Sequence, residues 1–160
     1  MAGKGENIMA EFGTFTSGSV LTAAELNAAG AWTSFTPSWV NLTPGNGVVS
    51  AAYSKFNKIL FVRVKFTWGT TTSCGDPVRM TLPASLSQDT NQDGIGWCNL
   101  GDTGVAGYTG YIGVISATQV GLLVINTAST YAAGNNVNNT RPHTFGNTDT
   151  MTFEFTTRLA

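Results

Sequence analysis

Oxygen-bearing side chains and a glycine follow one another in the segment Asp89-Thr90-Asn91-Gln92-Asp93-Gly94. This order is that of the first half of an EF-hand calcium loop, in which Asp89, Asn91 and Asp93 would supply the oxygen ligands that Ca²⁺ prefers. The twelfth position of such a loop needs a bidentate glutamate, and Leu100 stands there instead. We therefore expect an exposed turn between strands, with a structural calcium site as the alternative.

Residue types that perform acid–base or nucleophilic catalysis are few in this chain. His143 is the single histidine, and no motif places a nucleophile beside it, so we expect a lone surface side chain. Asp89 and Asp93 are close in sequence, but a glycosidase needs its carboxylate pair across a sugar-shaped cleft. Asp102 and Glu154 have no carboxylate neighbour at all. We therefore expect no catalytic residues, no cofactor and no enzyme activity.

The two cysteines, Cys74 and Cys98, leave two interpretations open. A disulfide would close a loop of useful length, but spacing alone does not show that the two thiols meet. Two separate, partly buried thiols are typical of a protein made in a reducing cytoplasm, and we favour this interpretation. Metal binding is disfavoured because the chain has no Cys-x-x-Cys pair and only one histidine.

Charged side chains are scarce and nearly balanced. They make up 11% of the residues, against about 25% in typical domains, and the net charge is -1. Such a chain has no field that attracts nucleic acid or an anionic membrane, and no apolar run reaches the ~18 residues that cross a bilayer. We therefore expect neither nucleic-acid binding nor membrane insertion.

Four of the eight basic residues nevertheless lie within one short stretch. We call this group the basic strip; its members are Lys55, Lys58, Arg63 and Lys65. It is either a contact patch for an acidic partner surface or solvated charge that protects an edge strand from aggregation. We favour solvated charge.

The strongest structural pattern that positions these side chains lies in residues 48–68. Residues 59–68 alternate strictly, with Phe61, Arg63 and Lys65 on one face and apolar side chains on the other. A period of two with β-branched and aromatic residues predicts a strand with one face on a core. The turn Lys55-Phe56-Asn57-Lys58 predicts that this strand forms a hairpin with residues 48–54.

The rest of the chain divides into a short N-terminal part and a β domain. Residues 1–12 read as an extended arm, and Thr22 with Glu25 forms a capping box for one short helix that Gly30 ends. Further strands are expected at 78–82, 95–100, 106–115, 119–125 and 148–159, with polar loops at 69–76 and 134–147. The expected fold is all-β, a jelly-roll-like antiparallel β-sandwich over residues 33–160 that follows the arm and helix of residues 1–32.

Two segments resemble a known family. Thr16-Ser17-Gly18-Ser19-Val20-Leu21-Thr22-Ala23-Ala24-Glu25-Leu26-Asn27, followed by Trp32, resembles the N-terminal segment of tail-fibre and minor tail proteins of tailed bacteriophages. In such proteins a β module follows this N-terminal segment. This chain resembles that module in four successive parts: Phe35–Trp39, Tyr53–Lys58, a long strand and Met80–Pro83. The family has Gly-Lys at the hairpin turn, where this chain has Asn57-Lys58; asparagine tolerates the positive φ that the turn needs.

The resemblance implies a non-enzymatic virion surface protein, generally a homotrimer with a jelly-roll-like body. It would be assembled in the cytoplasm of the bacterial host and attached to the major capsid protein or to tail proteins. Residues 1–32 would be the anchor, with Leu21, Leu26 and Trp32 as its packing residues. Because the chain comprises only an anchor and one domain, a capsid decoration or short head-fibre protein is favoured over a tail fibre or minor tail protein.

A carbohydrate-binding module is the alternative from a different functional class. Exposed aromatic side chains on one sheet face would then bind a host-surface glycan. The residues available for such a groove are Trp97, Tyr108, Tyr111 and Tyr131.

Overall fold

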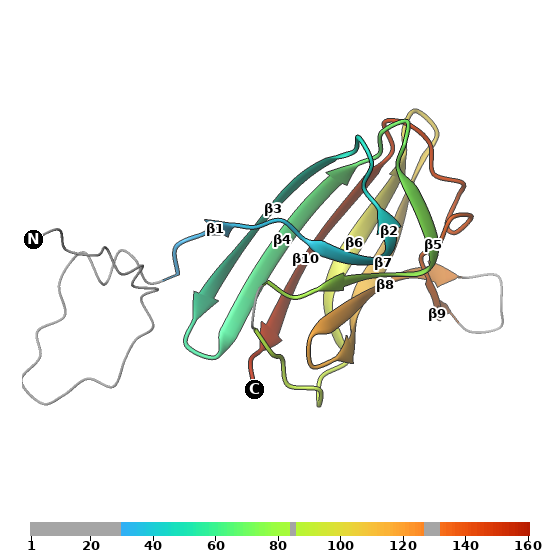
Figure 1. The fold of residues 1–160 in the computed structure, drawn as a ribbon. Helices are drawn as coiled ribbons and strands as arrows, with labels where there is room; N and C mark the ends of the chain where they lie inside the picture. The colour runs from blue at the N-terminus through green and yellow to red at the C-terminus, as the bar shows by residue number, and fades with distance from the viewer. Residues whose placement is uncertain (1–29, 84–85, 127–131) are drawn as a thin grey trace, which may run out of the picture.

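The computed structural model describes residues 30–83, 86–126 and 132–160, and strands make up most of them (Figure 1). The strands are β1 (Thr33–Ser34), β2 (Ser38–Thr43), β3 (Val48–Phe56), β4 (Ile59–Thr67), β5 (Ser73–Thr81), β6 (Gly94–Asp102), β7 (Ala106–Ser116), β8 (Gln119–Asn126), β9 (Ala133–Asn136) and β10 (Thr150–Arg158). The described residues contain no helix, and so none that is long and apolar enough to cross a bilayer. The expected arm and short helix lie within residues 1–29, outside the described residues.

All ten strands belong to one antiparallel sheet, which curls into a half-barrel (Figure 1). Their order is β1-β3-β4-β10-β6-β7-β8-β5-β2, and β9 pairs with β8. The expected all-β, antiparallel class is confirmed. The hydrogen bonds do not divide the strands into two sheets; instead, one continuous sheet bends so that its two ends face each other across a core.

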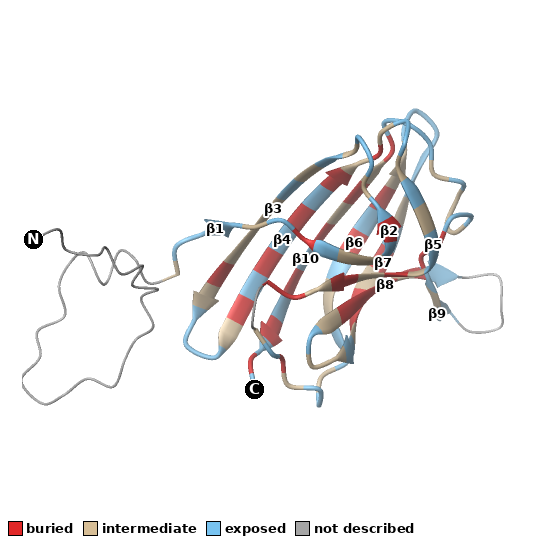
Figure 2. Cartoon of the chain, in the orientation of Figure 1, coloured by how far each residue is buried: buried red, intermediate tan, exposed pale blue. Residues whose placement is uncertain are grey.

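The hairpin formed by β3 and β4 is confirmed, with Asn57 and Lys58 as its turn. Asn57 has a φ of 52°, the left-handed conformation that this turn requires and that asparagine tolerates. Along β4 the side chains alternate between buried and exposed positions from Leu60 to Phe66, as expected from the period of two. Figure 2 shows this alternation as red and pale bands along β4 and β10.

Aromatic contacts join the facing parts of the curled sheet. Trp39 of β2 meets Phe66 of β4 edge to face, with ring centroids 6.0 Å apart, and meets Phe153 of β10 at 6.2 Å. Phe66 and Phe153 are fully buried. Edge-to-face pairs of this kind add to the burial of large apolar area, so these three rings hold the two ends of the sheet together.

Two strands extend into segments that were expected to be polar loops. β5 begins at Ser73, inside the expected loop 69–76, because Ser73 and Cys74 pair with Thr43 and Leu42 of β2. β9 lies at the start of the expected loop 134–147. Both strands pair at or near the edge of the sheet. Backbone hydrogen bonds form there without a run of alternating apolar side chains, so the sequence pattern did not predict these parts of the strands.

Candidate functional site

The segment considered for calcium is a turn between β5 and β6. One oxygen of the Asp89 carboxylate accepts hydrogen bonds from the backbone and side-chain nitrogens of Asn91, at 2.9 and 3.0 Å. The other oxygen is paired with the guanidinium of Arg158 at the end of β10. Asp93 is exposed. The Asp89 carboxylate is therefore paired with the Arg158 guanidinium, and the segment holds this turn against β10.

The expectation that His143 is a lone surface side chain is wrong. Its side chain is only 8% exposed, and its Nε2 lies 3.2 Å from Oδ2 of Asp149. The imidazole stacks on Tyr108 of β7 and contacts Phe145, which in turn stacks on Trp68. The residues between β9 and β10 fold back over one end of the curled sheet, a long-range contact that the polar composition of that segment did not indicate.

Asp149 ties this end of the molecule together. Its carboxylate accepts hydrogen bonds from the backbone N–H groups of Thr103, at 2.9 Å, and Gly146, at 2.7 Å, besides contacting His143. Burial raises the pKa of this carboxyl, but the Gly146, Thr103 and His143 interactions outweigh burial, so the pKa lies below its ordinary value of 3.8.

Asp102 completes a cluster with the residue types of a metal site. One ligand atom from each of Asp102, His143 and Asp149 lies within 4.8 Å of the other two. These are ligand types that suit divalent cations. Both carboxylate oxygens of Asp149 already accept backbone hydrogen bonds, so the cluster has a structural use without a cation.

Replacing Asp149 with asparagine is expected to destabilise the protein more strongly at about pH 7 than at about pH 3. The folded pKa is below the unfolded one, so ionised Asp149 adds stability above the unfolded pKa, and this stability is lost as the pH falls. An amide in this position also places N–H groups against N–H donors, at a cost of about 1–3 kcal/mol. Urea unfolding at both pH values measures the difference.

Asp93→Asn, at an exposed carboxylate, is the control. Equal losses at both pH values would show that the charge of Asp149 contributes nothing.

Neither thiol is a nucleophile at neutral pH. Both cysteines are free: Cys98 lies fully buried in the core, and Cys74 is half-buried on β5. Burial raises the pKa of Cys98 to about 12 and also raises that of Cys74. The thiolate is the reactive form, so both side chains remain protonated and unreactive.

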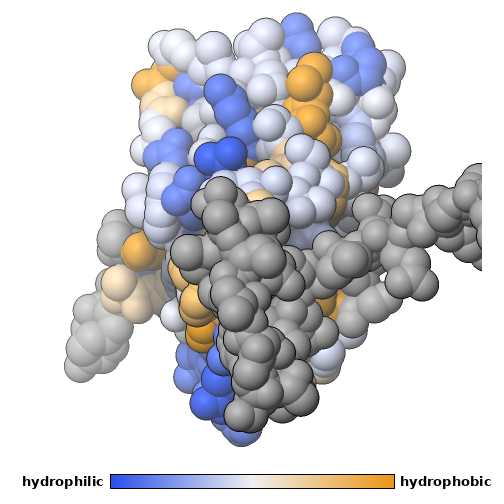
Figure 3. Space-filling model, turned by 90° about the vertical axis from the view of Figure 1, so that its left-hand side faces the viewer, coloured by the Kyte–Doolittle hydropathy of each residue, from blue (hydrophilic) through white to orange (hydrophobic). Residues whose placement is uncertain are grey.

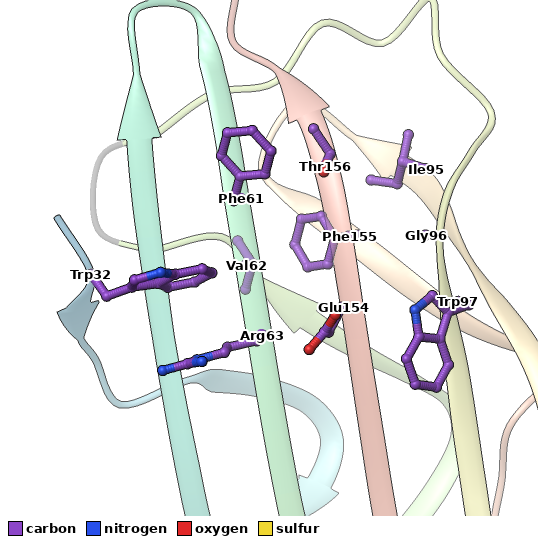
Figure 4. A pocket seen from close by; sticks show the side chains of 10 residues that line it. All are labelled: Trp32, Phe61, Val62, Arg63, Ile95, Gly96, Trp97, Glu154, Phe155 and Thr156. Carbon is purple, nitrogen blue, oxygen red and sulfur yellow. The ribbon is translucent and has the colours of Figure 1, made fainter. Parts of the chain in front are cut away.

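A groove of about 360 Å³ lies on the outer face of the sheet, away from the core (Figure 4). We call it the outer groove. The side chains that matter most in it are those of Trp32, Phe61, Arg63, Ile95, Trp97 and Glu154. They come from the segment before β1 and from β4, β10 and β6, so the groove crosses adjacent strands from the middle of the sheet.

The register of the strands sets the order of the polar side chains in the outer groove. Arg63 on β4 lies opposite Glu154 on β10, and Glu154 lies opposite Trp97 on β6. The Arg63 guanidinium is 4.5 Å from the centre of the Trp32 ring, a cation–π contact. Figure 4 shows Arg63 beneath the Trp32 indole and Glu154 between Arg63 and Trp97. Within the described residues the Glu154 carboxylate has neither an ion pair nor a side-chain hydrogen bond.

The basic strip does not behave as one surface. Arg63 and Lys65 share the exposed face of β4, as the alternation predicts, whereas Lys55 and Lys58 lie at the hairpin end. β4 is flanked by β3 and β10, so Arg63 and Lys65 do not protect an edge strand. Arg63 contacts Trp32 rather than only water. Lys58 and Lys65 are exposed.

The predicted anchor residues and glycan-groove aromatics are only partly described. Trp32 is half exposed above β4, and Leu21 and Leu26 fall outside the described residues. Among the aromatics, Trp97 and Tyr111 are cross-strand partners on the outer face. Tyr108 is on the opposite face against His143, and Tyr131 lies outside the described residues. The four residues therefore do not line one groove.

Glu154 was not predicted as a site residue, because it was considered only as one member of a catalytic carboxylate pair. A signal was present: the alternation of residues 151–156 puts Glu154 on the polar face of its strand. What no local pattern indicated is that this strand lies between β4 and β6.

Comparison with known proteins adds no relative. No protein-family model matches the chain, and neither the curated proteins nor the solved structures contain a significant match.

Proposed function

We propose that this chain is a non-enzymatic structural protein on the exterior of a tailed-bacteriophage virion. In this proposal residues 1–32 attach the protein to the particle, and the β domain of residues 33–160 is displayed. Three copies form the functional unit, and the attachment partner is the major capsid protein, with tail proteins as the alternative.

The observation that carries the proposal is the location of the residues that resemble the phage family. Trp39, from the Phe35–Trp39 segment of the similar β module, pairs with Met80 of the Met80–Pro83 segment. The same Trp39 ring contacts Phe66, at the end of the long strand between those segments. Residues from the separate segments thus build one structural unit of the core. Such a pattern supports a shared module rather than shared catalytic chemistry.

The surface of the described residues also supports display rather than catalysis. Figure 3 shows a face dominated by weakly polar and hydrophilic residues, with hydrophobic residues in separate patches. At one end of the sheet His143 and Asp149 contact each other, and Asp149 also accepts hydrogen bonds from the backbone N–H groups of Thr103 and Gly146.

The mass of the full-length protein in solution tests the proposed oligomer. Native mass spectrometry is expected to give a species of three chains, each of 16.8 kDa. If the trimer is obligate, it is expected to persist on dilution to low micromolar concentration, because the folded subunits of obligate oligomers often depend on one another. A stable monomer over the same range would contradict the proposal.

A further inference from the structure

We propose that the outer groove binds a neutral hexopyranose unit of a glycan, held between Trp32 and Trp97 and hydrogen-bonded by Glu154 and Arg63. This inference goes beyond the virion role and does not depend on it, because the groove is complete within one chain.

The two indoles supply the apolar part of the site. Trp32 and Trp97 are each 49% exposed, although large aromatic side chains usually bury most of their area. Figure 4 shows the Trp32 indole over Arg63 at one end of the groove and the Trp97 indole beyond Glu154 at the other. The C–H face of a pyranose ring is flat and weakly apolar, so it can cover an indole while its hydroxyl groups remain at the rim.

The polar groups between the indoles are suited to hydroxyl groups. Glu154 offers a carboxylate with no ion pair or side-chain hydrogen bond among the described residues, so it can accept from two neighbouring hydroxyls. The contact with Trp32 orients the Arg63 guanidinium, whose N–H groups can donate hydrogen bonds to sugar hydroxyls across the groove from Trp97. A volume of about 360 Å³ is near the lower end of the range for small-ligand pockets and holds about one or two sugar rings.

Other occupants fit the outer groove less well. An extended peptide cannot add to the sheet here, because β4, β10 and β6 each have strand neighbours on both sides. A purely apolar surface would bury Glu154 without a partner, which is costly. A phosphate backbone would meet the Glu154 carboxylate, and the chain has a net charge of -1.

The close approach of two strands holds the site in place. Gly96 of β6 lies in the floor of the groove, and a Cβ at this position would collide with the Glu154 carbonyl oxygen and the Phe155 side chain. Glycine therefore lets β6 approach β10, which brings Trp97 beside Glu154 on rigid strands rather than on loops.

An array of neutral hexose and N-acetylhexosamine oligosaccharides, probed with the full-length protein, tests the proposal. We expect binding to at least one oligosaccharide. By isothermal titration with that oligosaccharide, Trp97→Ala and Glu154→Gln are each expected to weaken the affinity about tenfold or more. Phe56→Ala, at an exposed aromatic outside the groove, and Asp93→Asn, at an exposed carboxylate outside it, are the controls and should leave the affinity unchanged.

Thermal unfolding of each variant distinguishes a loss of sugar contacts from a loss of folded protein. Trp97 and Glu154 are exposed, so both variants should unfold close to the wild-type temperature. Absence of binding to every oligosaccharide would overturn the proposal. Binding that both variants retain in full would also overturn it, because the sugar would then lie elsewhere. Neither result would alter the trimeric mass or the attachment to phage particles, so failure here is distinguishable from failure of the virion proposal.

Discussion

Replacing Phe66 with alanine is expected to lower the free energy of unfolding by about 3–5 kcal/mol, the usual cost of removing a fully buried aromatic ring. Phe66 is 0% exposed and contacts Trp39 and Trp68. The substitution leaves a cavity where the two ends of the curled sheet meet, and close-packed neighbours on strands relax into it only partly. The variant therefore loses both the burial of the apolar ring and the contact with Trp39 that joins β4 to β2.

The same strand offers a matched control of identical chemistry. Phe61 lies on the opposite face of β4 and is 40% exposed, so Phe61→Ala should cost about 1 kcal/mol or less. Urea unfolding followed by tryptophan fluorescence compares the two variants, with Phe66→Leu as an intermediate case that retains most of the side-chain volume. Equal losses for Phe61→Ala and Phe66→Ala would contradict the assignment of the two faces.

The alternation on β4 was predictable because it depends only on neighbouring residues. A strand with one buried face must repeat every two residues, and residues 59–68 do so without interruption. The same reasoning located β6, β7, β8 and β10 to within a few residues of their observed limits. Asn57 at the hairpin turn was likewise predictable, since its side chain tolerates positive φ.

The order of the strands was not predictable from local patterns. β10 is the last strand in sequence, yet it lies between β4 and β6. Arg63, Glu154 and Trp97 therefore become neighbours through pairings between distant segments, which depend on the competition among all strands for partners. Each residue type was visible in the sequence, but the groove that they form was not.

Two further features show how polar composition conceals tertiary structure. His143 stands in an Asn-rich segment that has the composition of a surface loop, but Phe145 and Asp149 fasten that segment to the body. Glycine recurs at every third position from Gly101 to Gly113, and most of these glycines lie within β6 and β7. Gly110 is needed there because a Cβ would collide with the Leu123 carbonyl oxygen of β8.

Removal of residues 1–32 is expected to abolish attachment to the virion while leaving the β domain folded. Residues 1–29 lie outside the described residues, and the strands of the sheet begin at Thr33. Among the described residues, the buried core and the side chains packed against it begin at Phe35, so the deletion removes none of that core. Trp32 is lost with the anchor, but it is half exposed and contributes little burial to the fold.

Sedimentation with phage particles tests the virion proposal most directly. Full-length protein, added to particles of the encoding phage that lack it, should sediment with isolated heads at a fixed stoichiometry in multiples of three. The variant without residues 1–32 should show the circular dichroism and cooperative unfolding of a β protein and remain in the supernatant. Binding to isolated tails alone would assign the protein to the tail. Absence of the full-length protein from heads and tails alike, or equal attachment of the variant, would contradict the proposed anchor and display of the β domain.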